Sequence, residues 1–296
     1  MSLLSNPQAH PERIRSVVAL HRAYEDPVSS EDAHRWLAPP VERASKRAAT
    51  GSIKEAVGLG LLTSTERGNT LANVSCPTEP AAFADALHSV LIDLNEDDAN
   101  HALLRTYAWI VFKCDQERGT TWLRQLSRTR LAEQIGDALS ARDAPYVRNP
   151  TQLTPWTRWM SFLGLGWEGG SSSFMPYFLP DPTKRMEREF QKIGQQMGFE
   201  KELPADDVFS SLASRMPYID GGHIFEEISQ MCGQRTDTKD VSALTSASLR
   251  QLHDGGQITL YAPEGDAPDV WRLERNRFDA LKNVLTITIH RESTDE

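Results

Sequence analysis

The sequence predicts a mainly helical protein of the α+β class, in which helix-and-hairpin modules flank a helical middle region. Apolar residues recur at helical spacing through most of the 296 residues, a length that favours two or three domains. Near each end of the chain, at 52–62 and 248–260, a short helix stops at glycine and continues directly as an apolar strand. A helix that leads at once into a hairpin is the second half of a winged helix. The sequence therefore predicts tandem winged-helix domains.

The first domain is expected at 1–77 and contains the N-terminal winged helix. Its three helices are indicated by "PERIRSVVALHRAY", "SSEDAHRWLAPP" and "TGSIKEAVGLGLL", the second of which begins at a serine cap and ends at two prolines. A minimal hairpin follows, with its turn at Arg67–Gly68–Asn69. The apolar face of the first helix is expected to carry Ile14, Val17, Val18 and, one turn on, Tyr24. The other side chains expected to face the core of this domain are Trp36, Leu37, Ile53, Ala56 and Val57.

The middle domain is expected at 78–200. Its first part, 81–145, is helical in pattern throughout, which is more helix than a winged helix needs. The segment 154–180 then has the order helix, glycine, strand, glycine-rich turn, strand, and so predicts a third, winged-helix-like unit. The apolar face of its helix is expected to consist of Trp156, Trp159, Met160 and Leu163.

The last domain is expected at 201–296 and contains the C-terminal winged helix. "PADDVFSSLASRM" and "GGHIFEEISQMCG" predict its first two helices, and the third begins at Ser246 and stops at the glycines of "DGGQ". Apolar and polar residues alternate in the strands 258–262 and 270–273. We expect these strands to pair as an antiparallel hairpin around the polar turn "PEGDAPD".

Charge and composition limit the class of protein. The formal net charge is −9, which disfavours a generally adhesive nucleic-acid binder but leaves room for a local basic face. No stretch approaches the roughly 18 apolar residues of a membrane span, and the first residues lack the apolar core of a signal peptide. We therefore expect no membrane partner. The three cysteines are far apart and odd in number, which favours a reduced, cytoplasmic protein.

Motifs for catalysis are missing from the sequence. It contains no zinc-protease, P-loop or nucleophile-elbow pattern, and "GLGLL" lacks the preceding strand of a dinucleotide loop. "GWEGGSSS" opens no helix and is better explained as a hairpin tip than as a phosphate cradle, while "LNEDDANHA" is better explained as a solvated helix start than as a calcium loop. We therefore expect no catalytic residues, no cofactor and no metal.

A winged helix binds DNA by placing its third helix in the major groove, with the hairpin touching phosphates. In the N-terminal domain this surface is locally basic, and the candidate DNA-binding residues are Arg43, Lys46, Arg47, Ser52, Lys54 and Arg67. In the C-terminal domain the third helix offers Ser246, Ser248, Arg250 and Gln251, but the acidic hairpin turn is poorly suited to phosphate. In the middle domain a basic helical face is expected from Arg118, Arg124, Arg128 and Arg130. For each surface the alternative is a solvated helix face or a protein-docking face.

Two motifs in the middle of the chain connect this domain order with a known family. "PWTRWMSFLGLGW" is followed by "LPDPTKRMEREF", and the pair lies between the two predicted winged helices. In this combination the sequence resembles the DpdG-like accessory proteins of bacterial clusters that install 7-deazaguanine derivatives in DNA and defend against phage. The resemblance implies a cytoplasmic, non-catalytic component that works beside helicase or nuclease subunits. It supplies no catalytic residues.

The leading hypothesis is a non-catalytic subunit, binding DNA or acting as an adaptor, in a bacterial DNA-modification and restriction system with a role in antiviral defence. The partners would be double-stranded DNA and the helicase or nuclease subunits of the same system. One alternative is a winged-helix transcriptional regulator, although the three-part chain and the acidic hairpin turn count against it. Two others are a protein–protein scaffold without direct DNA contact and an enzyme whose site is assembled from dispersed residues.

Overall fold

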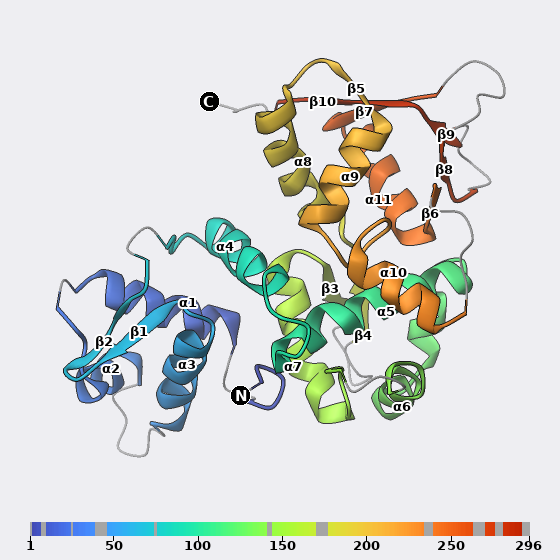
Figure 1. Ribbon diagram of the computed structural model, residues 1–296. Helices are drawn as coiled ribbons and strands as arrows, with labels where there is room; N and C mark the ends of the chain where they lie inside the picture. Colours follow the sequence, from blue (N-terminus) through green and yellow to red (C-terminus); the bar gives the residue numbers. More distant parts are fainter. Residues whose placement is uncertain are drawn as a thin grey trace.

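The computed structural model describes residues 2–6, 10–24, 26–38, 46–73, 76–140, 144–169, 177–233, 239–262, 270–275 and 281–291. Its described part is mainly helical with small sheets, as the sequence predicts. Figure 1 shows the first three helices and their hairpin beside α4 and α7, with the strands β5, β7 and β10 at the far end of the molecule. The buried apolar side chains of all these parts belong to one continuous cluster.

The N-terminal unit has the predicted order of three helices and a hairpin. Its elements are α1 (Pro11–Arg22), α2 (Ser30–Leu37), α3 (Arg47–Gly58), β1 (Leu62–Thr65) and β2 (Gly68–Leu71). The Ser29 hydroxyl caps α2 by accepting a hydrogen bond from the Asp32 amide, and β1 and β2 pair antiparallel. Val28, just before α2, forms a bridge with Asn69, so it lies beside β2 as a third strand position.

Most of the expected core of this unit is confirmed, and the exceptions are Trp36 and Tyr24, which is 42% exposed and lies beyond the end of α1. Ile14, Val17, Val18, Ile53 and Ala56 are buried, whereas the Trp36 side chain is 64% exposed. The short helix α2 directs Ala33 and the half-buried Leu37 inward. Trp36 lies about 100° around the helix from Leu37 and therefore faces solvent.

The middle region consists of helices and one hairpin, as predicted. Its elements are α4 (Pro80–Ile92), the 3-10 helix Ala99–His101, α5 (Ala102–Gln116), the 3-10 helix η2 (Thr121–Gln125), α6 (Arg128–Leu139), α7 (Pro150–Leu163), β3 (Gly166–Gly169) and β4 (Tyr177–Pro180). Helix α5 is buried along almost its whole length and packs against α10 and α11. The expected apolar face of α7 is fully buried, and Gly164 ends this helix in the left-handed conformation, with φ 79°. Strands β3 and β4 pair antiparallel.

The C-terminal region is built from helices and two three-stranded sheets. Its elements are α8 (Thr183–Met197), β5 (Glu202–Pro204), α9 (Ala205–Arg215), α10 (His223–Met231), β6 (Asp240–Val241), α11 (Ala243–Asp254), β7 (Ile258–Tyr261), β8 (Trp271–Leu273), β9 (Asn283–Val284) and β10 (Thr286–Ile289). One sheet has the strand order β5–β10–β7, and the other has the order β6–β8–β9. Helix α8 packs against α9, α11 and β10.

The predicted hairpin between residues 258–262 and 270–273 is wrong. Strand β7 pairs antiparallel with β10, whereas β8 pairs with β6 and β9 in the other sheet. Strand β10 is the partner of β7 because this pairing buries Ile287 and Ile289 completely. Strand β8 is held elsewhere by Trp271, whose ring stacks on Phe209 with the centroids 4.0 Å apart and whose indole nitrogen donates to Asp206 at 2.7 Å.

The two ends of the chain nevertheless share a strand arrangement. In the N-terminal unit Val28 lies beside β2, and β2 lies beside β1. In the C-terminal region β5 lies beside β10, and β10 lies beside β7. In both regions the last strand lies in the middle of three. On one side it has the strand position that precedes the second helix, and on the other side it has the strand that follows the last helix. In the C-terminal region α8, and not the predicted helix at α9, precedes the first strand position. Here α10 and β6 lie between the second helix and the last, and β8 and β9 lie between the two later strands.

Buried charged groups join the middle region to the C-terminal region. On α5, Nη1 of Arg105 donates to both carboxylate oxygens of Glu227 on α10, at 2.8 and 2.7 Å, and Arg105 is 1% exposed. On α4, His88 is bonded to the Tyr218 hydroxyl at 2.7 Å and lies 3.7 Å from the Glu189 carboxylate. Burial, reinforced by the charges of Arg185 and Lys192 on α8, lowers the pKa of His88 well below 6.5. The His88 imidazole is therefore neutral in the folded protein at neutral pH.

Candidate nucleic-acid interface

Helix α3 presents a basic exposed face, which we call the α3 face and define by Lys46, Arg47, Thr50 and Lys54. Lys46 is the N-cap residue of α3. Arg47, Thr50 and Lys54 follow at intervals of three and four residues, so they share one side of the helix. Arg67 is also exposed, in the turn of the hairpin that follows α3. Four of the six predicted DNA-binding residues are therefore at the surface.

The other two predicted residues are not part of this surface as described. Arg43 lies outside the described residues. Ser52 is only 1% exposed, and its hydroxyl donates to the Ala48 carbonyl at 2.9 Å, within α3. The prediction that Ser52 donates to a phosphate is therefore wrong for this conformation, because the side chain is turned into the fold.

Burial also changes the charge of α3, since Glu55 is 2% exposed and lies on the inner side of the helix. Its carboxylate accepts a hydrogen bond from the Asn6 side chain at 3.3 Å. Asn6 thus packs behind α3. Leu3 and Leu4 are buried in the core, and the Leu3 amide donates to the Asn100 side chain at 2.7 Å. As a result the carboxylate that the sequence places within α3 is withdrawn from the exposed face, which becomes more strongly basic.

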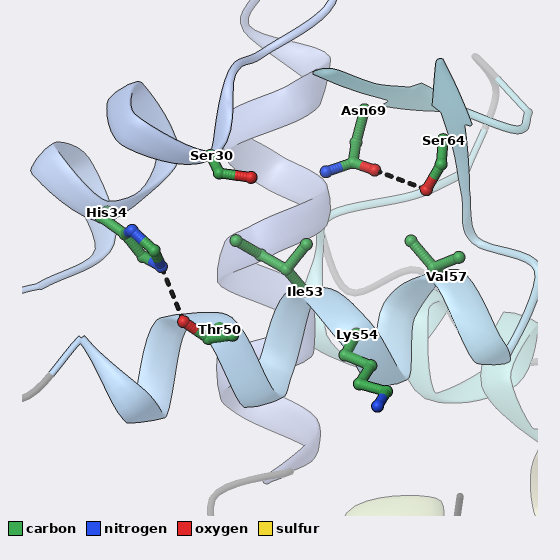
Figure 2. A pocket seen from close by; sticks show the side chains of 8 residues that line it. All are labelled: Ser30, His34, Thr50, Ile53, Lys54, Val57, Ser64 and Asn69. Atoms are coloured by element: carbon green, nitrogen blue, oxygen red, sulfur yellow. Dashed lines mark hydrogen bonds between the residues drawn. The ribbon is translucent and has the colours of Figure 1, made fainter. Parts of the chain in front are cut away.

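A hollow with a volume of about 240 Å³ lies between α2, α3 and the hairpin. We call it the hairpin pocket, and the residues that line it are Ser30, His34, Thr50, Ile53, Lys54, Val57, Ser64 and Asn69. Figure 2 shows that α3 forms one side of this pocket, with α2 and the hairpin facing each other above it. Thr50 and Lys54 belong both to the pocket and to the α3 face, so the two surfaces are continuous.

Hydrogen bonds fix the helix side of the pocket. The Thr50 hydroxyl donates to the Lys46 carbonyl at 3.0 Å, and the same oxygen lies 2.8 Å from Nε2 of His34. The Thr50 oxygen thus links α3 to the His34 ring of α2. Sequence reasoning missed this pocket, since no motif marks a histidine and an asparagine that approach only when α2 and the hairpin pack on α3.

The last helix of the C-terminal region, α11, which the sequence predicted as the third helix of a winged helix, is covered instead of exposed. Ser246, Ser248 and Arg250, which the sequence suggested as a DNA-facing set, are at most 8% exposed. The Ser246 hydroxyl donates to the Val241 carbonyl at 3.1 Å, and Nη2 of Arg250 donates to the carbonyl oxygens of Glu274 and Leu281 at 2.8 and 3.0 Å. Gln251 is exposed and bonded to Thr183 at 3.2 Å. Helix α11 therefore cannot enter a groove without unfolding its surroundings.

The arginines of the middle region do not form the predicted helical face. Arg118 lies in a turn after α5 with φ 53°, and Arg124 lies in η2. Arg128 and Arg130 lie in α6, where Arg128 donates to Thr154 at 2.8 Å and Arg130 pairs with Glu133 at 2.9 Å. The face predicted from the sequence is thus divided among separate elements and is partly engaged in internal contacts.

Chemistry elsewhere in the described chain is limited. Burial raises the pKa of the Cys114 thiol to about 12, which keeps it protonated at neutral pH. Within the described ranges, no group of three or more His, Cys, Asp or Glu side chains is placed to hold a metal ion. The search of the same residues for a helix of sufficient length and apolar character to cross a membrane found none.

The fold and this surface define a mainly helical protein with small sheets, whose N-terminal unit exposes a basic helix beside a hairpin. Comparison with protein families assigns it more closely. The chain belongs to the DpdG-like family, whose model matches residues 1–266. The resemblance seen in the sequence is thereby confirmed, and membership indicates a part in a Dpd-type system. Comparison with curated proteins gave no match, and comparison with solved structures gave none either.

Proposed function

We propose that this protein is a non-catalytic DNA-binding or adaptor subunit of a bacterial DNA-modification and restriction system that acts in antiviral defence. In this proposal the N-terminal unit is a winged helix that binds double-stranded DNA. Helicase or nuclease subunits of the same system are its protein partners, as the family resemblance implies. The single observation that carries the proposal is the exposed basic face of α3, with Arg67 exposed beside Glu66 in the neighbouring hairpin turn.

The strand arrangement supports the winged-helix interpretation of the N-terminal unit. Its order is α1, the strand position at Val28, α2, α3 and the hairpin of β1 and β2, with Val28 beside β2. In a helix-turn-helix arrangement of this kind the last helix enters the major groove. Here that helix is α3, and its outward side carries Lys46, Arg47 and Lys54.

Electrostatics support DNA contact at this surface despite the net charge of −9. Binding to a duplex depends on cations that meet phosphates, and a local basic patch attracts DNA even when the rest of the protein is acidic. Lys46, Arg47 and Lys54 form such a patch on α3, and Glu55 is buried behind it. Arg67 adds a fourth exposed cation in the hairpin turn, where Glu66 is exposed beside it. Because α11 is covered by the segment that contains β8 and β9, the C-terminal region is better suited to an adaptor role.

The experiment is a lysine footprint of the full chain with and without a DNA duplex. Amine-reactive labelling read by mass spectrometry should show protection of Lys46 and Lys54 when DNA is present. Lys184 and Lys201 are exposed lysines far along the chain and serve as internal controls, since their labelling should not change. Equal labelling of all four lysines at saturating DNA would reject the N-terminal unit as the contact. Isolation of the tagged protein from its host, with identification of the proteins that accompany it, tests the adaptor part.

A scaffold without direct DNA contact is the second candidate. The observation that favours it is the exposed indole of Trp36 on α2, a large apolar group of the kind that anchors protein interfaces. The same labelling experiment separates the two candidates. A scaffold leaves Lys46 and Lys54 unprotected by DNA, while substitution of Trp36 by serine reduces the recovery of partner proteins.

A further inference from the structure

The hairpin pocket carries a polar group that the fold leaves ready for a ligand. Asn69 is 8% exposed, and its side-chain oxygen accepts a hydrogen bond from the Ser64 hydroxyl at 2.9 Å. Its amide nitrogen takes no part in this bond and lines the pocket. Figure 2 shows this nitrogen pointing into the pocket, toward the Ser30 hydroxyl on the opposite wall. This donor meets the solvent of the pocket, so a ligand that enters can supply its acceptor.

The walls of the pocket add apolar and planar surface to this donor. Ile53 and Val57 of α3 form its apolar side, and Ile53 is 8% exposed. The His34 ring lies on the α2 side and is held in place by its bond to Thr50. A phosphate group makes no favourable contact with apolar walls. A nucleobase, in contrast, has apolar faces and carries hydrogen-bond acceptors along one edge. Imidazole rings are among the side chains on which unstacked bases pack.

The size of the pocket selects among planar ligands. An apolar cavity of about 150 Å³ holds benzene, which corresponds to roughly 25 Å³ for each heavy atom. On this scale the volume of about 240 Å³ accommodates about ten heavy atoms, which is the size of a purine. The pocket is open to solvent beside the α3 face, so a base can enter it from DNA that lies along α3.

We propose that the hairpin pocket receives one unpaired purine base of the bound DNA, with the Asn69 amide and the Ser30 hydroxyl donating to acceptors on the edge of the base. This inference rests on the proposed function, because the α3 face must hold the DNA beside the pocket. A paired base cannot enter, since its edge is engaged by its complement and its faces are stacked. The pocket therefore selects DNA that already contains an unpaired base, such as a bulge, a flap or an open strand.

The test compares two DNA probes that differ in one nucleotide. One is a fully paired duplex, and the other is the same duplex with a single unpaired 2-aminopurine, whose fluorescence rises when the base leaves the stack. The full chain should bind the second probe about five- to tenfold more tightly, the range expected for one or two hydrogen bonds, and should raise its fluorescence. The variant Asn69→Leu removes the donor at similar side-chain size. It should lose the preference and the fluorescence rise, while its affinity for the paired duplex is unchanged.

Two further variants guard against unfolding and against an indirect effect. Ser30→Ala changes an exposed residue and should halve or further reduce the preference without altering thermal unfolding. Val57→Phe fills the pocket from its apolar side and should abolish the preference. Equal binding of both probes by the unaltered chain, with no change in fluorescence, would overturn the pocket proposal and leave the proposed function standing. Binding of neither probe at low salt would overturn both.

Discussion

The salt dependence of DNA binding gives a quantitative test of the α3 face. The change is the double substitution Lys54→Gln and Arg67→Gln, which removes one cation from α3 and one from the hairpin turn. Both side chains are exposed, so the fold should tolerate the change within about 0.5 kcal/mol. With Lys46 and Arg47, the unaltered surface offers four cations to the duplex.

The magnitude follows from the release of counterions. Four phosphate contacts give a slope of log K against log salt of roughly −3.6, and two contacts give roughly −1.8. Between 50 and 200 mM salt the unaltered chain should therefore lose about 150-fold in affinity, and the double variant only about 12-fold. The assay is fluorescence anisotropy of a labelled duplex, titrated at four or more salt concentrations. A flatter slope in the variant, more than a weaker affinity at one salt concentration, is the expected signature.

A matched control removes two cations elsewhere. Arg130→Gln and Lys184→Gln change exposed residues of α6 and α8, and their slope should equal that of the unaltered chain. If the control pair flattens the slope and the α3 pair does not, the DNA lies against α6 or α8 and the reasoning about α3 is refuted. An identical slope in all three proteins would show that none of these cations meets a phosphate.

The remaining predictions concern buried groups. Ser52→Ala should leave DNA affinity unchanged and cost at most about 1 kcal/mol in urea unfolding, because the hydroxyl is bonded inside α3; a loss of affinity without loss of stability would restore Ser52 to the DNA surface. Glu227→Ala leaves the buried Arg105 guanidinium without its carboxylate partner and should lower the free energy of unfolding by about 3–5 kcal/mol in urea. The control Glu117→Ala removes an exposed pair and should lower it by under about 1 kcal/mol. His88 has a lowered pKa when folded, so the unfolded chain binds its proton first, and stability is lost as pH falls below 6.5, by at most about 1.4 kcal/mol per pH unit. His88→Gln should show a shallower loss between pH 6.5 and 5, and parallel curves for the two proteins would contradict the assignment.

Local patterns were sufficient for the helices and for two of the hairpins. The glycine after α7 and the apolar spacing of Trp156, Trp159 and Leu163 predict a helix that ends where the structure ends it. The hairpin of β1 and β2 follows from its tight turn, because its partners are adjacent in the sequence. In each case the deciding contacts lie within a few residues of each other.

The failures share a physical cause, which is contact between distant segments. Strand β7 pairs with β10 because burial of Ile287 and Ile289 outweighs the proximity of β8, and the alternation of "TITI" alone does not name its partner. Within the candidate site, Lys46, Arg47, Lys54 and Arg67 follow from charge and helical position. Ser52 was misplaced because the packing of α1 and the first residues against α3 widens the buried side of that helix. The hairpin pocket is formed by α2, α3 and the hairpin together, so no local sequence pattern predicts it.

The burial of α11 has a consequence for how natural variation in this protein should be interpreted. The N-terminal unit keeps the outer side of its last helix exposed, whereas the C-terminal region encloses its last helix, so substitutions in these two helices should have different effects. Substitutions at Ser248 or Arg250 in α11 remove internal contacts, and they should lower the amount of folded protein in the cell. Substitutions at Lys46 or Lys54 in α3 should leave that amount unchanged and alter only occupancy on DNA. The amount of folded protein and its occupancy on DNA, measured together across a library of variants, would therefore separate residues needed for stability from residues needed for binding.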